Sequence, residues 1–190
     1  MGPFAHLGLT AGAAVVVNSV WHYRRKPDLA GRTVAYRRPQ GFWRPLSVKS
    51  LLAVLFGAVL SDLIDKPIGN LFFESYFANG RIYAHTLLFL LVAAALGLVL
   101  YLTKKRTWLL LVAFGVLMHL ILDEMWQVPQ ALFWPLMGAA FPRYDNMETI
   151  PWLLDLLRSL IFDPEIILSE VVGLLLGAWA ALLTWRHRAY

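Results

Sequence analysis

Six ionisable side chains of metal-ligand type interrupt or border the apolar stretches of this sequence. His119 and Asp123 lie four residues apart in an otherwise apolar stretch. Asp62 and Asp65 lie three residues apart at the end of another. Because residues three or four apart share one face of a helix, each pair can present two ligands to one point. The full candidate set of ligands is His6, Asp62, Asp65, His85, His119 and Asp123.

This set indicates metal chemistry, because ionisable groups within a membrane span are costly and therefore functional by default. Imidazole with carboxylate suits Zn²⁺, Mn²⁺ or Fe²⁺. Two such ions about 3.5–4 Å apart would clamp a phosphoryl oxygen and acidify a bound water. We therefore expect two divalent ions, zinc or alternatively manganese. Glu170 can reach the same cavity as a ligand or a polar helix contact. The alternatives for the pairs are an ion pair between His119 and Asp123, and helix capping by Asp62 and Asp65.

The composition places these residues in an integral membrane protein. The chain has 190 residues, 59% of them hydrophobic and only 15% charged, with a mean hydropathy of +0.60. A soluble domain of this length would be more polar. There is no cysteine, which excludes disulfides and thiolate metal sites. The first apolar run lacks the basic start and the cleavage site of a signal peptide.

Five apolar runs are long enough to cross about 30 Å of hydrocarbon as helices. They predict an all-α membrane protein with one domain over residues 1–190. The expected spans are Pro3–Tyr23, Leu46–Ile64, Tyr83–Thr103, Thr107–Met125 and Ile166–Trp185.

The basic residues predict the orientation of these spans. Thirteen of the 17 lysines and arginines lie in the first loop, just inside the second span, in the loop between the third and fourth spans, and at the C-terminus. By the positive-inside rule, the N-terminus is outside and the C-terminus inside. Residues 24–45 then form a basic cytoplasmic loop, and residues 126–165 form an outer interfacial segment, with an interfacial helix at Trp152–Phe162. All six candidate ligands fall toward the outer side.

Several motifs together resemble one family. They are His6 near the start, Asp62-Leu63-Ile64-Asp65, Arg81-Ile82-Tyr83-Ala84-His85-Thr86, His119-Leu120-Ile121-Leu122-Asp123, and Trp134-Pro135. This order and spacing resemble the YdjM-like membrane-bound metal-dependent hydrolases. The family's acidic motif has one residue fewer between its acids, and Gly80 stands where the family often has a histidine.

The resemblance implies phosphoester hydrolysis, because the family is thought to be distantly similar to zinc-dependent phospholipase C and single-strand nucleases. A metal-bound hydroxide would attack phosphorus, with Asp65 or Glu170 as general base. Arg81 and Lys66, with Arg143 as a weaker candidate, would hold the phosphate oxygens. The expected substrate is a phospholipid or lipid-linked phosphate at the outer face of the plasma or inner membrane.

Two other functions remain open. One is an ion or metal transporter, although the inner halves of the spans are nearly free of polar residues. The other is a regulatory membrane protein with a structural metal. Nucleic-acid binding is not expected, because membrane topology already accounts for the basic loop. Membrane lipids are the expected surroundings and substrate, and the sequence does not predict an oligomeric state.

Overall fold

The computed structural model describes residues 2–24, 43, 46–143, 158 and 161–186, and every regular element among them is helical. The all-helical fold class is therefore confirmed. Five long helices coincide with the five expected apolar runs: α1 (Pro3–Arg24), α2 (Val48–Pro67), α4 (Leu87–Lys104), α5 (Trp108–Leu122) and α8 (Pro164–Arg186). The short segments between them are η1 (Ile68–Phe72), α3 (Glu74–Phe77), η2 (Tyr83–His85), η3 (Met125–Gln127) and α6 (Pro129–Leu132).

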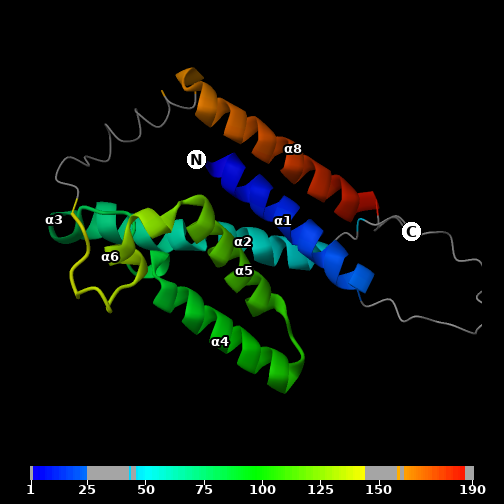
Figure 1. The fold of residues 1–190 in the computed structure, drawn as a ribbon, viewed down its shortest axis with the longest axis horizontal. Helices are drawn as coiled ribbons and strands as arrows, with labels where there is room; N and C mark the ends of the chain where they lie inside the picture. The colour runs from blue at the N-terminus through cyan, green and yellow to red at the C-terminus, as the bar shows by residue number, and fades with distance from the viewer. Residues whose placement is uncertain (1, 25–42, 44–45, 144–157, 159–160, 187–190) are drawn as a thin grey trace, which may run out of the picture.

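The long helices associate in pairs (Figure 1). Helix α8 runs beside α1, α2 runs beside α5, and α4 packs on the outside of α5. Helix α1 also contacts α2 and α5, so that it joins the two pairs. The short segments gather at one end of the bundle, next to the end of α2 and the end of α5.

Glycines bring the paired helices into backbone contact. A Cβ atom on Gly57 of α2 would lie 2.1 Å from the carbonyl oxygen of Val112 in α5. A Cβ atom on Gly8 of α1 would lie 1.7 Å from the carbonyl oxygen of Gly173 in α8. Such close approach is typical of helix pairs in membranes, where packing replaces the hydrophobic effect as the driving force.

Local signals define the helix ends. The Ser47 hydroxyl accepts a hydrogen bond from the Ser50 amide at the start of α2. Thr86 does the same for the Phe89 amide at the start of α4, which satisfies amides that have no partner within the helix. Lys105 ends α4 in the left-handed conformation, with φ of 55°, and the chain reverses there into α5.

Within the part of the chain that the structure describes, three helices are long and apolar enough to cross a membrane: Pro3–His22, Leu87–Lys104 and Pro164–Arg186. Helix α5 is apolar but has 15 residues, or about 22 Å at 1.5 Å per residue. Helix α2 has 20 residues but includes Lys49, Asp62, Asp65 and Lys66. The chain is thus an all-helical membrane protein, while the count of five spans and their orientation stay predictions.

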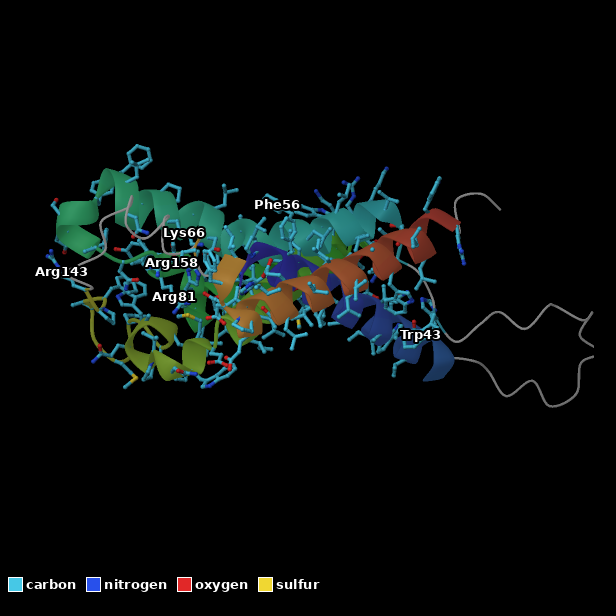
Figure 2. All side chains as sticks on the ribbon, turned by 90° about the horizontal axis from the view of Figure 1, so that it is seen from above. Trp43, Phe56, Lys66, Arg81, Arg143 and Arg158 are labelled. Atoms are coloured by element: carbon cyan, nitrogen blue, oxygen red, sulfur yellow. The ribbon has the colours of Figure 1, made fainter. Side chains whose placement is uncertain are left out.

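The basic residues that the sequence predicts on the outer side share one end of the long axis of the molecule. The four basic residues expected on the outer side lie toward one end, and Trp43 lies at the other (Figure 2). These four are Lys66, Arg81, Arg143 and Arg158. Most of the expected basic loop 24–45 and of the expected interfacial helix Trp152–Phe162 lies outside the described residues.

Candidate metal centre

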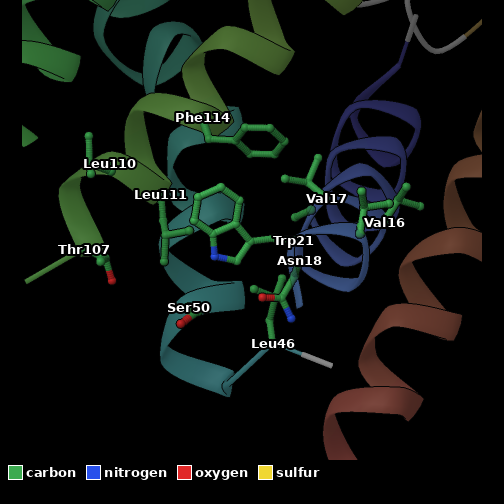
Figure 3. A pocket seen from close by; sticks show the side chains of 12 residues that line it. Val16, Val17, Asn18, Trp21, Leu46, Ser50, Thr107, Leu110, Leu111 and Phe114 are labelled. Atoms are coloured by element: carbon green, nitrogen blue, oxygen red, sulfur yellow. The ribbon is translucent and has the colours of Figure 1, made fainter. Parts of the chain in front are cut away.

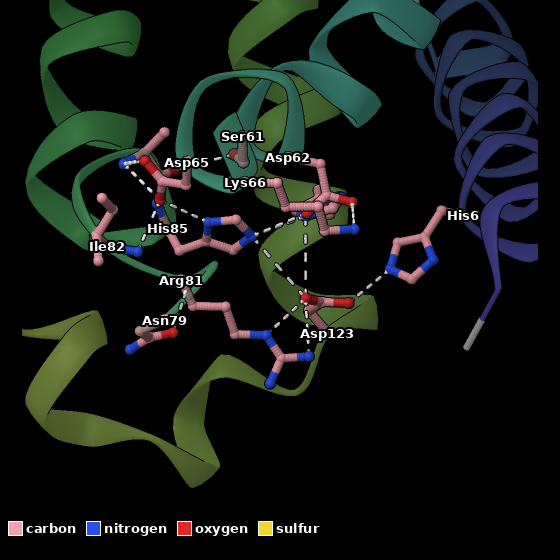
Figure 4. A network of polar contacts seen from close by, with 12 residues as sticks. His6, Ser61, Asp62, Asp65, Lys66, Asn79, Arg81, Ile82, His85 and Asp123 are labelled. Atoms are coloured by element: carbon pink, nitrogen blue, oxygen red, sulfur yellow. Dashed lines mark hydrogen bonds and ion pairs between the residues drawn. The ribbon is translucent and has the colours of Figure 1, made fainter. Parts of the chain in front are cut away.

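Three donor residues from three segments face one point, and Figure 4 shows two of them, Asp62 and His85, with their polar contacts. Asp62 comes from the last turns of α2, His85 from η2, and His119 from the last turn of α5. The Nε2 atoms of His85 and His119 are 3.2 Å apart. Asp62 Oδ1 lies 3.5 Å from the first and 3.7 Å from the second. This is the one cluster of potential metal donors found among the described residues.

Asp123, the residue that follows α5, brings a fourth potential donor atom, a carboxylate oxygen, near this group. Its Oδ2 lies 3.9 Å from His85 Nε2 and 4.0 Å from His119 Nε2. Ligand atoms in a tetrahedral zinc site with bonds of about 2.0–2.1 Å are about 3.3 Å apart. The observed separations run from 3.2 to 4.0 Å, so one is slightly below that value and the others are above it. The donor set therefore fits a divalent ion of the zinc type, and the number of ions stays a prediction.

Asp65 lies behind His85 and not among these donors. It is fully buried, and its carboxylate accepts hydrogen bonds from the amides of Ile82 at 2.8 Å, Ala84 at 2.9 Å and His85 at 3.1 Å. The same carboxylate accepts a hydrogen bond of 2.7 Å from His85 Nδ1. A proton on Nδ1 directs the lone pair of Nε2 toward the centre, which is the tautomer that a metal requires. Asp65 thus orients a donor.

His119 is held by packing. Its ring lies between those of His6 and His85, with centroid distances of 5.0 and 5.1 Å. Its Nδ1 is buried and has no hydrogen-bond partner among the described residues. The two imidazoles of the centre therefore differ, because His85 is oriented by a carboxylate and His119 by its neighbouring rings.

His6 and Arg81 contact the centre through Asp123. His6 Nε2 lies 2.9 Å from Asp123 Oδ1, and its Nδ1 lies 3.1 Å from the carbonyl oxygen of Gly2. Arg81 donates from Nε and Nη2 to Asp123 Oδ2, at 3.1 and 3.0 Å. The structure thus brings His6 close to the donors. His6 contacts Asp123 and is not itself in the donor cluster.

Lys66 pairs with Asp62, the other carboxylate that faces the centre. Its Nζ lies 2.7 Å from Asp62 Oδ2, one helical turn away. The side chains of Lys66 and Arg81 are 42% and 41% exposed, so both cations reach the surface beside the centre. Arg143 lies farther along the same end, and its Nη2 donates to the Ser75 carbonyl at 3.1 Å.

Glu170 connects α8 to the first turn of α1. Its carboxylate accepts hydrogen bonds from the amides of Phe4 at 2.9 Å and Ala5 at 3.2 Å. These amides have no partner within the helix, so Glu170 fixes the start of the helix that carries His6. It is not part of the donor cluster of Asp62, His85 and His119.

Two residues that position the centre, Ser61 and Asn79, are not predicted from the sequence. The buried Ser61 hydroxyl donates to the Ala84 carbonyl at 2.9 Å, which ties η2 to α2. Asn79 accepts from the Arg81 amide and donates to the Pro142 carbonyl, both at 2.8 Å. Their only signal in the sequence is adjacency, since Ser61 precedes Asp62 and Asn79 lies two residues before Arg81.

Aromatic rings pack beside η2. Tyr83 contacts Trp134 and Phe141 with centroid distances of 5.3 and 5.0 Å, and Phe77 also contacts Tyr83 at 5.9 Å. This cluster packs η2, the segment that carries His85, against the loop after α6.

The comparisons with known proteins agree with the membrane fold. The family model described as YdjM inner membrane protein matches residues 1–189. No curated protein and no solved structure matches the chain.

Proposed function

This chain belongs to the YdjM inner membrane protein family, and we propose that it is a membrane-embedded metal-dependent hydrolase acting on a phosphoester of a membrane lipid. The observation that carries the proposal is the convergence of Asp62, His85 and His119 on one point, with Asp65 orienting the His85 ring toward it. A divalent ion in such a site polarises a phosphoryl oxygen and acidifies water.

Within this proposal, Asp62, His85 and His119 hold the ion, and the fourth position is left to water. Asp65 and Glu170 both engage backbone amides, so we assign the general-base role to Asp123, the carboxylate that faces the centre from outside the donor cluster. Asp65 then acts as a positioning residue, and Glu170 holds the helix of His6.

Arg81 and Lys66 are the phosphate-binding residues in this proposal. Each is paired with a carboxylate of the centre and partly exposed. A lipid phosphate that approaches from the surface could therefore take over these charge-assisted hydrogen bonds. The site would face the extracytoplasmic side, where headgroups are within reach.

An open centre favours catalysis over a structural role. The Asp62 side chain is 32% exposed, whereas those of His85 and His119 are buried. A structural zinc site is closed and complete, but a catalytic one keeps a position for water. The exposure at Asp62 is where that water would bind.

Metal content is the direct test. Full-length protein purified in detergent without chelators would be compared with Asp62→Ala and His119→Ala by elemental mass spectrometry. His22→Ala is the matched control, because His22 is exposed near the other end of α1. We expect stoichiometric zinc or manganese in wild type and control, and its loss in the other two.

Activity would be measured on the same proteins with vesicles of defined phospholipids, by detection of the released phosphate-containing product. Hydrolysis that follows the metal content supports the proposal. A wild type without stoichiometric metal overturns it, and metal without hydrolysis of any phospholipid or lipid-linked phosphate assigns the ion a structural role.

A further inference from the structure

A second feature lies at the opposite end of the bundle from the metal centre. A cavity of about 640 Å³ opens between the second half of α1 and the first halves of α2 and α5 (Figure 3). From Thr107 at its rim to His119 there are twelve residues of α5, or about 18 Å. Its apolar walls include Val17, Trp21, Leu46, Leu110, Leu111 and Phe114.

The walls and the opening suit a hydrocarbon chain. The volume lies within the range of about 300–1,000 Å³ that is common for small-molecule sites. Trp21 and Phe114 project into the space from α1 and α5 (Figure 3). Val17 and Trp21 are both 55% exposed, so the cavity is open at the side, where a bilayer places lipid chains.

Three polar residues line the cavity, and exposed basic residues adjoin two of them in the sequence. Asn18, Ser50 and Thr107 are among its lining residues. Lys49 directly precedes Ser50, Arg106 directly precedes Thr107, and both basic side chains are exposed. Hydroxyl groups flanked by cations recognise phosphate, and basic residues at a membrane surface attract anionic lipids.

We propose that this cavity binds an anionic phospholipid, with one acyl chain between α1 and α5 and the headgroup between Lys49 and Arg106. The apolar walls, together with exposed basic residues next to Ser50 and Thr107, favour an anionic amphiphile over a neutral lipid or a free phosphate. The bound lipid would fill the space that separates α1 from α5 at this end. The site is separate from the proposed hydrolytic centre, and its occupant is not the substrate.

Native mass spectrometry of the full-length protein tests this binding. Phosphatidylglycerol and phosphatidylcholine with identical acyl chains would be added separately to the detergent-purified protein. We expect wild type to retain one phosphatidylglycerol, with about tenfold preference over phosphatidylcholine. Lys49→Gln combined with Arg106→Gln should abolish this preference while leaving weak binding of both lipids.

Val17→Trp would fill the cavity and reduce phosphatidylglycerol retention about tenfold. Leu98→Trp is the matched control, because Leu98 is 50% exposed on α4 and does not line the cavity. The control should bind as wild type, and an unchanged elution volume of Val17→Trp in size-exclusion chromatography would verify that the variant folds.

Three results would overturn the proposal. Wild type could retain both lipids equally, which would mark an adventitious amphiphile. Val17→Trp could retain phosphatidylglycerol as wild type does. Retention could instead depend on His119, being lost in His119→Ala but kept in Val17→Trp, which would assign the lipid to the metal centre. Absence of bound metal in the wild type, by contrast, would overturn the hydrolase proposal and would not affect the lipid-binding proposal.

Discussion

The same three helices, α1, α2 and α5, build two very different ends of this protein. At the end with the metal centre, carboxylates and imidazoles point inward and contact one another within 2.7 to 4.0 Å. At the opposite end the cavity walls are mostly apolar, and Lys49 and Arg106 are exposed at the surface. The difference teaches how an apolar bundle accommodates charge: a buried ionised group needs partners, and an exposed one needs none.

This contrast predicts where substitutions matter. Asp65 is fully buried with four hydrogen-bond donors, whereas Lys49 lies at the surface. Removal of a group from the metal end leaves its buried partners unsatisfied, and removal of a group from the rim leaves only solvent contact. The variants below break or sharpen that contrast, in order of their expected effect on the free energy of unfolding.

Asp65→Ala should have the largest effect. It leaves the amides of Ile82, Ala84 and His85 without their acceptor. Buried unsatisfied groups cost about 1–3 kcal/mol each, so we expect the free energy of unfolding to fall by about 3–5 kcal/mol. Denaturation of the purified protein in detergent measures this loss. Unchanged stability would contradict the role assigned to Asp65.

Asp65→Asn separates positioning from folding. The amide oxygen still accepts hydrogen bonds, so the variant should fold. Its weaker hold on the His85 ring should reduce metal affinity about 10–100-fold, as is common for residues that orient a metal ligand. Titration with zinc measures the affinity. Phosphatidylglycerol retention at the other end should not change.

Gly115→Ala should have an intermediate effect. A Cβ atom at Gly115 would lie 2.2 Å from the carbonyl oxygen of Val54, so α5 must move away from α2. That movement separates His119 from Asp62. We expect a loss of about 1–3 kcal/mol in the free energy of unfolding, together with weaker metal binding.

Gly12→Ala is the control for this substitution. Its Cβ would lie 3.6 Å from the nearest atoms, all in Leu176, which is ordinary contact. Stability and metal titration should then match wild type. A Gly115→Ala variant that also matches wild type would show that the backbone contact does not hold the donors together.

Arg81→Gln should change stability least. Its side chain is partly exposed, so loss of the pair with Asp123 should cost less than about 1 kcal/mol. Under the proposed function, phosphoester hydrolysis should fall about 10²-fold while metal content stays constant. Arg143→Gln, at the same end, should retain full activity. Equal activity of the two variants would contradict the phosphate-binding role proposed for Arg81.

The sequence alone predicted the helices and most of the centre's neighbourhood. Long apolar runs with Ser47 and Thr86 at their starts determine α2 and α4 locally, because burial and capping depend on residues close in the chain. The grouping of Asp62, His85 and His119 could also be expected, since each lies at the end of its apolar run that is predicted to face the outer side.

The roles of the acids could not be predicted in this way. Asp65 and Asp123 look alike in sequence, since each stands one helical turn from a candidate ligand near the end of an apolar run. Only the return of the chain through Arg81–His85 surrounds Asp65 with backbone amides, while Asp123 is left facing His6 and Arg81. Likewise, only the packing of α8 on α1 brings Glu170 to the amides of Phe4 and Ala5.

The sequence by itself therefore determined which segments are helical and which residue types gather at each end. Tertiary structure decided which carboxylates face the centre, which orient its ligands, and where three helices leave a cavity. The physical reason is the distance along the chain over which each interaction acts. Helix formation and capping act over a few residues, whereas the partner of a buried charge depends on which helix faces meet, and backbone contacts such as that at Gly115 set this geometry.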